Sequence, residues 1–294
     1  MAKTSFTGPV RSENGFKLIS KNTTSGLISE RTVHDLGIKD TRRYYLEEYF
    51  DLLPGINGDL ASTTESTNTP VSRQFEILGT NHTSALATYS ATVAGMAMTT
   101  ATADQDRMIV APHLDTKQGA WAGTKWGTEN QVHWECSIRT SSAIDNQWIW
   151  AGLKKTNVVE LATDTEQAFF TFGTDADNAG QSFTDFTKLH FVHSIGGTDY
   201  ISQLPITVAA STNYHLKIKF DSDRKVSIFV DGEQYNVTST SGSTGGTAVT
   251  KGTTKSAAIT DDVDLIPYIG IENCDAAAAV LNVQFEAISR LIFE

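Results

Sequence analysis

Apolar and polar residues alternate with a period of two along much of this 294-residue chain. The alternation is clearest at 214–220 and 226–230, two runs that are separated by a short polar turn. Side chains at successive positions of a strand point to opposite faces of a sheet. The segment 214–232 is therefore predicted to be a β-hairpin with one buried face.

The same reasoning predicts further strands. Residues 132–139 place Trp134 and Cys136 on one face and polar side chains on the other, which is typical of a half-buried strand. The segments 147–153 and 168–172 are short and rich in aromatic residues, as expected for central strands that are covered on both faces. A closing strand is predicted near the C-terminus.

One short helix is predicted, over residues 41–53, with Asp40 or Thr41 as its cap and Pro54 at its end. Its apolar residues recur at i, i+1, i+4, i+5 and i+8 and would form one stripe. The stripe consists of Tyr45, Leu46, Tyr49, Phe50 and Leu53. It could pack on the protein's own sandwich or dock on a neighbouring subunit, and the sequence leaves both possibilities open.

The chain is predicted to divide at a Ser/Thr-rich linker, 57–70, that has almost no apolar residue. Residues 1–69 would then form an N-terminal arm with the helix, and residues 70–294 a β-sandwich. The first 30 residues are polar and contain turn signals, so an extended arm or a small hairpin is expected there. A Gly/Thr/Ser-rich stretch at 238–255 predicts a long mobile loop.

Composition supports an all-β globular protein. The chain has 39% apolar and 19% charged residues, and 22 glycines against six prolines. A net charge of −11 without basic clusters argues against nucleic acid or an anionic membrane as a partner. No stretch approaches the roughly 18 apolar residues that span a bilayer, and residues 1–9 lack the apolar core of a signal peptide. We therefore expect synthesis in the cytosol and no membrane insertion.

The hairpin at 214–232 resembles that of concanavalin-like lectin and laminin-G domains. The segments 148–153 and 268–271 resemble strands of that fold's front sheet, and the resemblance covers roughly residues 70–294. It implies an all-β, concanavalin-like β-sandwich (jelly roll), here preceded by an N-terminal arm with one short helix. The opening segment 4–16 is similar to the N-termini of virion proteins of marine tailed phages, which often place a polar arm before a lectin-like domain.

Many concanavalin-like domains are glycosidases or lyases, so whether this chain has an active site depends on its individual residues. Retaining glycosidases of this shape carry Glu-x-Asp-x-x-Glu on one strand, with carboxylates about 5.5 Å apart. That triplet is missing, and Glu129 and Glu135 would lie roughly 20 Å apart along a strand. Gly-x-Ser-x-Gly is also missing, and His190 and His193 are interpreted as core or surface residues. We expect a non-enzymatic protein without catalytic residues or a cofactor.

No metal site is predicted either. Asp175 and Asp177 supply oxygen atoms at alternate positions and could hold calcium, but the distal glutamate of an EF-hand-type loop is absent, which favours a solvated turn. Cys136 and Cys274 are far apart and lack a Cys-x-x-Cys spacing, so they are interpreted as two reduced thiols.

Trp121 and Trp126 are the best candidates for glycan binding, because both lie in a glycine-rich segment where an indole could stack on a sugar ring. The alternative is that one or both close the end of the sandwich. We predict a capsid decoration or head-exterior protein that forms homo-oligomers in the virion, assembled in the host cytoplasm. Its arm would bind the major capsid protein or other virion subunits. The alternative is a glycan-binding module of a phage fibre that attaches to host glycan.

Overall fold

β-Strands make up nearly all of the regular structure in the described part of the chain. The computed structural model describes residues 17–21, 28–32, 43–51, 53–59, 75–81, 86–112, 126–156, 164–174 and 183–292. The chain divides into two units, residues 1–41 and residues 42–294. In the first unit, β1 (Lys17–Lys21) and β2 (Ile28–Thr32) pair antiparallel, so the start of the chain contains a small hairpin rather than a fully extended arm.

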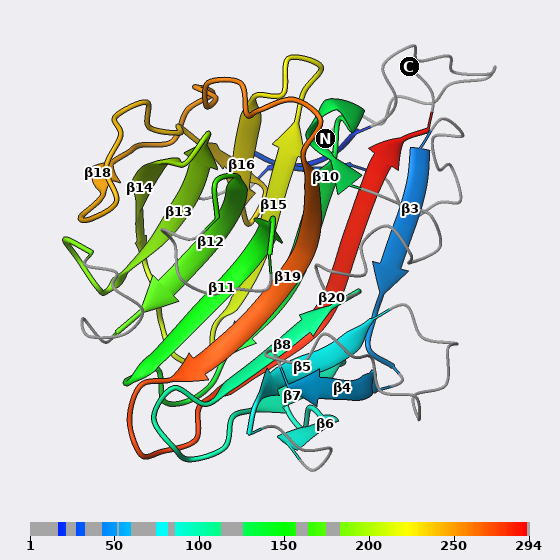
Figure 1. The fold of residues 1–294 in the computed structure, drawn as a ribbon, viewed down its shortest axis with the longest axis vertical. Coiled ribbons are helices and arrows are strands. Elements are labelled where there is room, and N and C mark those ends of the chain that lie inside the picture. Colours follow the sequence, from blue (N-terminus) through cyan, green and yellow to red (C-terminus); the bar gives the residue numbers. More distant parts are fainter. Residues whose placement is uncertain are drawn as a thin grey trace. The chain divides into compact units, whose positions relative to one another are not determined.

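The second unit is a sandwich of two large sheets, as predicted (Figure 1). In the eight-stranded sheet the order is β17-β16-β15-β10-β20-β7-β6, and β3 also pairs with β20. Its strands are β3 (Arg43–Glu48), β6 (Ala87–Tyr89), β7 (Met96–Thr99), β10 (His133–Thr140), β15 (Asn213–Phe220), β16 (Val226–Val230), β17 (Glu233–Tyr235) and β20 (Val280–Leu291).

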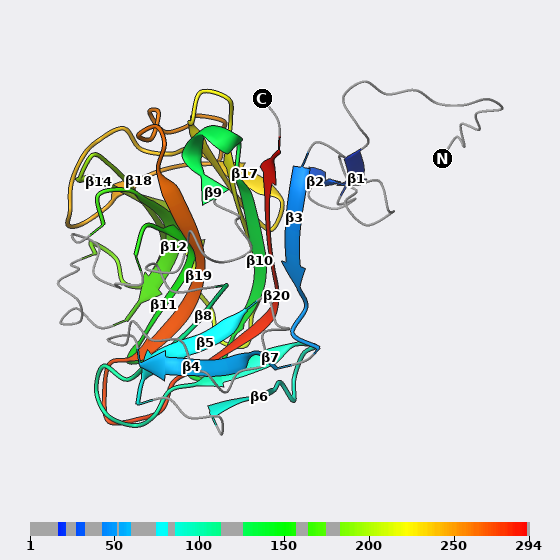
Figure 2. The ribbon, with the colours of Figure 1, turned by 45° about the vertical axis from the view of Figure 1, so that its right-hand side comes forward.

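In the ten-stranded sheet the order is β18-β14-β13-β12-β11-β19-β8-β5-β4, and β9 also pairs with β19. Figure 2 shows the two sheets as separate layers, with β11, β12 and β19 in one and β10, β20 and β3 in the other. The strands of the ten-stranded sheet are β4 (Gly55–Asp59), β5 (Glu76–Thr80), β8 (Arg107–Ala111), β9 (Trp126–Gly127), β11 (Gln147–Lys154), β12 (Gln167–Gly173), β13 (Lys188–Ile195), β14 (Thr198–Thr207), β18 (Thr247–Ala248) and β19 (Asp264–Asn273).

The core between the sheets is built from alternate residues of these strands. On β10, Trp134, Cys136 and Ile138 are buried while the residues between them are only partly covered, which confirms the predicted half-buried strand. The hairpin predicted at 214–232 is also confirmed, with β15 and β16 paired from Leu216–Val230 to Phe220–Val226. Periodicity alone was therefore sufficient to locate these strands.

The helix predicted over residues 41–53 is wrong. Residues 43–48 form β3, which pairs with β20 from Arg43 opposite Leu291 to Glu48 opposite Glu286. Adjacent tyrosines suit a pleated sheet as well as a helix, and here pairing with a distant strand overrides the local helical pattern. β3 is a strand of the eight-stranded sheet and β4 is a strand of the ten-stranded sheet, so both belong to the sandwich. The chain therefore divides after residue 41 and not after residue 69, the predicted boundary.

The predicted docking stripe is consequently split. Leu46 and Phe50 are fully buried, and Phe50 contacts Phe75 with ring centroids 6.0 Å apart. Leu53 packs against the same core, whereas 57% of Tyr49 is exposed. Tyr45 alternates with Leu46 and so points to the opposite face of β3. The alternative in which this segment packs on the protein's own sandwich holds for Leu46, Phe50 and Leu53.

The segment 238–255, predicted to be a long mobile loop, instead makes backbone hydrogen bonds along its length. Near its start Gly242 donates to the Asp199 carbonyl, and farther on Val249 donates to the Gln203 carbonyl. Residues 250–259, here called the strap, continue along β16 and β17, where the strap carbonyl of Thr254 accepts a hydrogen bond from Val237. The strap therefore covers the backbone edge that β17 would otherwise leave open.

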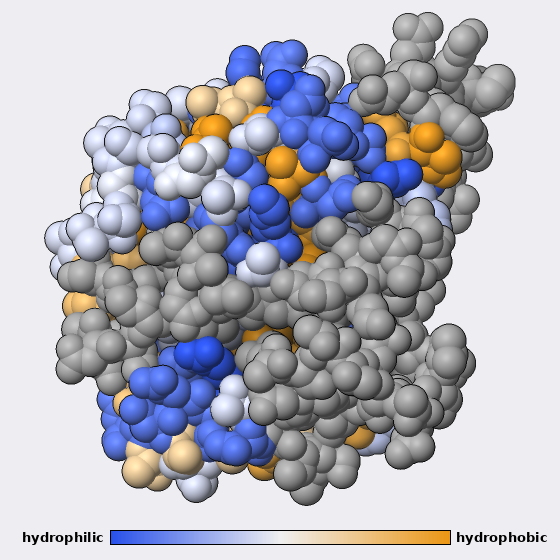
Figure 3. All heavy atoms as spheres, viewed as in Figure 1, coloured by the Kyte–Doolittle hydropathy of each residue, from blue (hydrophilic) through white to orange (hydrophobic). Residues whose placement is uncertain are grey.

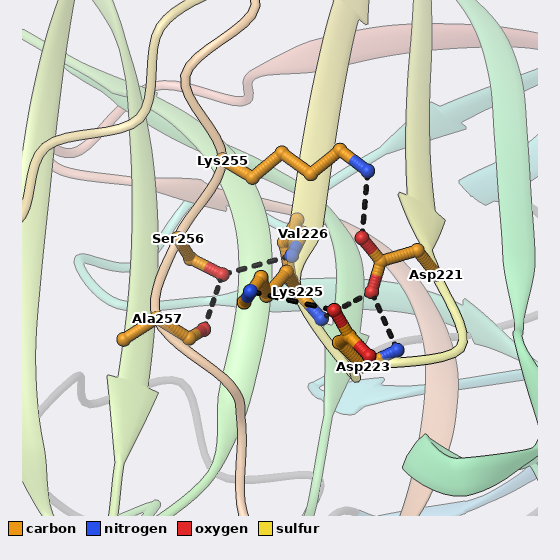
Figure 4. Close-up of polar contacts among 7 residues, drawn as sticks. All are labelled: Asp221, Asp223, Lys225, Val226, Lys255, Ser256 and Ala257. Carbon is orange, nitrogen blue, oxygen red and sulfur yellow. Dashed lines mark hydrogen bonds and ion pairs between the residues drawn. The ribbon is translucent and has the colours of Figure 1, made fainter.

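Asp221 ties the strap to the turn of the hairpin (Figure 4). Its Oδ1 accepts hydrogen bonds from the backbone N–H groups of Asp223 and Lys225, each at 2.9 Å. Its Oδ2 lies 2.6 Å from Nζ of Lys255 in the strap. An aspartate at the first position of a turn often accepts hydrogen bonds in this way, and here it also holds a second segment in place.

Glu286 is a buried carboxyl in the core between the sheets. It lies opposite Cys136 on β10, and its Oε1 accepts a hydrogen bond of 2.8 Å from Trp134 Nε1, while Oε2 has no hydrogen-bond partner. Burial raises the pKa of Glu286 to about 8, although the Trp134 hydrogen bond acts in the opposite direction. The carboxyl therefore keeps its proton in the folded protein at neutral pH.

We expect Leu46→Ala to lower the free energy of unfolding by about 2–5 kcal/mol, because the variant leaves a cavity in the sandwich core. Tyr49→Ala, three residues farther on and mostly exposed, should cost less than about 1 kcal/mol. Urea denaturation of both variants measures the difference. Equal, small effects would mean that the segment does not belong to the core.

We expect Glu286→Gln to stabilise the protein increasingly as pH rises from 5 to 8. An unfolded glutamate releases its proton near pH 4.3, but folded Glu286 holds it until about pH 8. Folding is therefore penalised progressively between these values, and the amide removes the penalty, by about 2 kcal/mol or more at pH 8. Denaturation at pH 5, 6.5 and 8 tests this, with the partly exposed Glu135→Gln as control. Parallel pH profiles for Glu286→Gln and the wild type would contradict it.

Candidate functional site

The central strands of the ten-stranded sheet are covered on both faces, as their aromatic runs predicted. Every residue of β11 and β12 is buried. One face packs on the eight-stranded sheet, and the other, here called the outer face, holds a second apolar cluster. On the side seen in Figure 3, hydrophilic and weakly polar residues make up most of the described surface. The buried members of the outer-face cluster are Leu78, Ile109, Ala111, Trp148, Trp150, Phe169, Phe183, Val192, Ile201, Ile266, Tyr268 and Cys274.

Five residues form a line across the outer face, one from each of five neighbouring strands. Residues directly opposite each other on adjacent strands point to the same face. The pairings place them in the order Gln203 (β14), His190 (β13), Thr171 (β12), Trp150 (β11) and Gly270 (β19). We call this line the polar row. It brings together side chains from positions 150 to 270 that have no sequence motif in common.

His190 is the most unusual member of the polar row. It is fully buried, its ring stacks on Phe183 with centroids 4.1 Å apart, and neither ring nitrogen makes a hydrogen bond of good geometry, although the Gln203 side chain and the Lys188 backbone lie close enough to act on the ring. Burial lowers the pKa of His190 to about 4, so the imidazole is neutral at physiological pH. Gln203 is the neighbouring polar group, and its Oε1 is also buried without a partner. Unpaired polar atoms of this kind are rare in protein interiors.

Trp150 provides an aromatic surface in the same row as His190, with Thr171 between the two. Its indole stacks on Tyr268, with centroids 5.9 Å apart, and contacts Trp148 edge-on at 5.6 Å. Trp148 Nε1 donates to Thr171 Oγ1 at 2.5 Å, but Trp150 Nε1 has no partner. Gly270 makes this packing possible, since a Cβ there would lie 2.7 Å from the Trp150 ring.

A second line across the outer face, here called the charged row, is linked by side-chain hydrogen bonds and an ion pair. It consists of Lys154, Gln167, Ser194 and Asp199 on β11 to β14. Gln167 Nε2 donates to Ser194 Oγ at 2.8 Å, and Ser194 Oγ donates to Asp199 Oδ1 at 2.6 Å. Lys154 Nζ lies 3.5 Å from the buried carboxylate of Asp164. Burial raises the pKa of Asp199.

The glycan candidates named from the sequence do not form this site. Trp126 is fully buried at the end of the core, pairs through β9 with β19 and contacts Tyr44, so it closes the sandwich, as the alternative proposed. Trp121, Asp175 and Asp177 lie outside the described residues.

The two carboxylates weighed as a catalytic pair lie on different elements. Glu129 is in the short 3-10 turn Thr128–Asn130, and Glu135 is on β10, where it pairs with Lys217 at 2.6 Å. His190 and His193 point to opposite faces of β13, and His193 stacks on Tyr200 inside the sandwich, 4.7 Å between centroids. The Trp148-x-Trp150 spacing was the one sequence signal for the outer face, because residues two apart share a face.

In the described part of the chain, no three His, Cys, Asp or Glu side chains are placed to share a metal ion. No helix in that part is long and apolar enough to cross a membrane.

The sequence matches no family model and no curated protein. Solved structures with a similar arrangement of strands include a Shewanella oneidensis protein of unknown function, at 12% identity over 86% of this chain and 88% of that chain (TM-score 0.48). Peanut lectin matches at 9% identity over 86% and 99% (TM-score 0.45). A prokaryotic β-1,3-1,4-glucanase from a mouse hindgut metagenome matches at 10% over 83% and 98% (TM-score 0.44). The all-β sandwich of two large sheets itself follows from the strand pairings.

Proposed function

We propose that the protein binds carbohydrate on the outer face of the ten-stranded sheet. One observation carries the proposal: Gln203, His190 and Trp150 lie in one row with unpaired polar atoms, beside the stacked rings of Trp150 and Tyr268. Each unpaired buried group costs about 1–3 kcal/mol. A ligand that supplied hydrogen bonds to these groups would recover that free energy.

The chemistry of the row suits a saccharide. A sugar ring has an apolar C–H face that can pack on an aromatic ring, and hydroxyl groups that both donate and accept hydrogen bonds. Trp150 Nε1 is a donor, Gln203 Oε1 is an acceptor, and neutral His190 offers one of each. Binding sites of this type combine apolar walls with a few polar groups that fix orientation.

A ligand reaches these groups only if covering residues move. Trp148, Trp150 and Tyr268 are 3%, 2% and 0% exposed. Among the described residues, Phe183 lies directly on the His190 ring, and a side chain at Gly246 would contact His190 at 3.3 Å. We propose that a bound sugar takes the place of the Phe183 ring on His190.

The proposed activity is binding without cleavage. Among the described residues, the carboxylates of the outer face already have partners: Asp164 pairs with Lys154, Asp199 accepts from Ser194, and Glu272 forms an ion pair with Arg107. Engaged carboxylates are poorly suited to act as the acid and the nucleophile of glycoside hydrolysis. A reducing-end assay on every ligand found would detect turnover and overturn this part of the proposal.

We expect an oligosaccharide screen of the purified full chain to give ligands, and two variants to weaken their binding. Trp150→Phe keeps an aromatic ring but removes the N–H, and His190→Phe keeps a ring but removes both nitrogens, so each should raise the Kd roughly tenfold. Tyr49→Ala, on the other sheet, is the control and should bind as wild type. Calorimetry measures the Kd values. Unchanged Kd values in both row variants would contradict the site.

A structural role is the second candidate. The sealed outer face favours it, because a subunit that only builds a particle gains stability from burying those rings and needs no open binding surface. The predicted place in a tailed-phage virion, including anchoring by the N-terminal arm and contacts with capsid subunits, stays a proposal. Antibody labelling of purified virions in electron micrographs tests it, and unlabelled particles would contradict it.

A further inference from the structure

Two cationic side chains of the outer face, Lys154 and Arg107, are compensated by carboxylates, and Lys188, two residues before His190, donates to Thr207 Oγ1 at 2.7 Å. Lys154 is buried against Asp164 at 3.5 Å and also acts on Asp199 in the charged row. Arg107 forms an ion pair with the fully buried Glu272. Because each of these positive charges lies beside a buried carboxylate, neither offers an uncompensated charge to an anionic ligand.

The polar row itself carries no charge. His190 sits on the Phe183 ring in a fully buried position, and the same burial keeps it in the neutral form at pH 7, since its pKa is about 4. Gln203, Thr171 and Trp150 have no ionisable group. A carboxylate or sulfate that entered the row would lose its hydration without gaining a counter-charge, which is strongly unfavourable.

The hydrogen-bonding pattern points the same way. The unpaired atoms include an acceptor, Gln203 Oε1, and a donor, Trp150 Nε1, and neutral His190 supplies one of each. A hydroxyl group can donate to Gln203 and accept from Trp150, whereas an ionised carboxylate or sulfate can only accept. A hydroxyl group can therefore pair with Gln203 Oε1 as the amide stands, whereas an anion can pair with Gln203 only through the amide nitrogen.

We infer that the ligand of the polar row is an uncharged saccharide, without carboxylate or sulfate groups. This inference rests on the proposed function and specifies the substrate class of the same site. It also assigns the recognition of hydroxyl groups to Gln203, His190 and Trp150. The stacked rings of Trp148, Trp150 and Tyr268 would pack equally well against a charged or an uncharged sugar, so they do not discriminate between the two.

The test uses matched pairs of oligosaccharides and the full chain at pH 7. Each neutral glucan, mannan, galactan or xylan oligomer is paired with a uronic or sulfated oligomer of equal length. We expect neutral members to bind at least tenfold more tightly, with a Kd that changes less than twofold between 50 and 500 mM NaCl. Tighter binding of the charged member in the pairs that bind would overturn the inference but leave carbohydrate binding intact. Binding of no oligomer at all would overturn the proposed function.

A charge-introducing variant locates the selection. Gln203→Lys adds a cation to the end of the polar row, at a half-buried position. The Kd of the charged oligomer divided by the Kd of its neutral partner should fall at least tenfold in this variant. Gln234→Lys, on β17 of the other sheet, adds the same charge elsewhere and should leave the preference unchanged. An equal preference in both variants, with unchanged melting temperatures, would show that selection does not occur at the polar row. If Gln203→Lys fails to fold, Gln203→Leu replaces it and should weaken neutral binding about tenfold without changing its salt dependence.

Discussion

The central strands of the ten-stranded sheet have to bury both of their faces, and most features of this protein follow from that constraint. Every residue of β11 and β12 is buried. Apolar side chains satisfy the constraint easily, but a polar side chain in such a strand has to find its hydrogen bonds inside the protein. A polar residue on these strands therefore lowers the stability of the fold unless it is hydrogen-bonded inside the protein, so the positions of such residues indicate where internal networks or binding sites lie.

The two lines across the outer face meet this requirement differently. In the charged row, Gln167, Ser194 and Asp199 form a chain of hydrogen bonds, and Lys154 lies against Asp164. In the polar row, His190 and Gln203 keep unpaired atoms although they lie on the same neighbouring strands. A satisfied network stiffens a sheet, whereas an unsatisfied one lowers stability unless something else binds to it.

Close packing of the aromatic rings depends on small residues in the adjacent strands. The Trp150 indole lies over Gly270, where even a methyl group would be 2.7 Å from the ring. Gly152, on the same strand as Trp150, has φ +157°, and a Cβ there would lie 2.5 Å from the Ala168 carbonyl oxygen. Tyr268 is opposite Gly152 and stacks on Trp150. The aromatic surface is thus produced by pairs of large and minimal residues across the sheet.

The sequence alone determined the all-β class, the hairpin of β15 and β16, the half-buried strand β10 and the doubly buried strands β11 and β12. These features depend on the side chains of consecutive residues, and a period of two or an unbroken aromatic run expresses them locally. The concanavalin-like fold was also predicted, from the resemblance of those segments to known domains.

Only the tertiary structure decided the fate of residues 43–53 and the identity of the candidate site. Two tyrosines and a leucine suit a helix or a strand, and the pairing of β3 with β20, at the other end of the chain, settled the choice. Trp126 and Trp150 both stand among aromatic or glycine-rich neighbours, but one closes the core and the other faces outward from it. Strands that are buried on both faces lack an alternation of polar and apolar residues. Their sequence therefore does not indicate to which face a given side chain points. The polar row exists because the registers of five strands align, and register depends on contacts between distant segments.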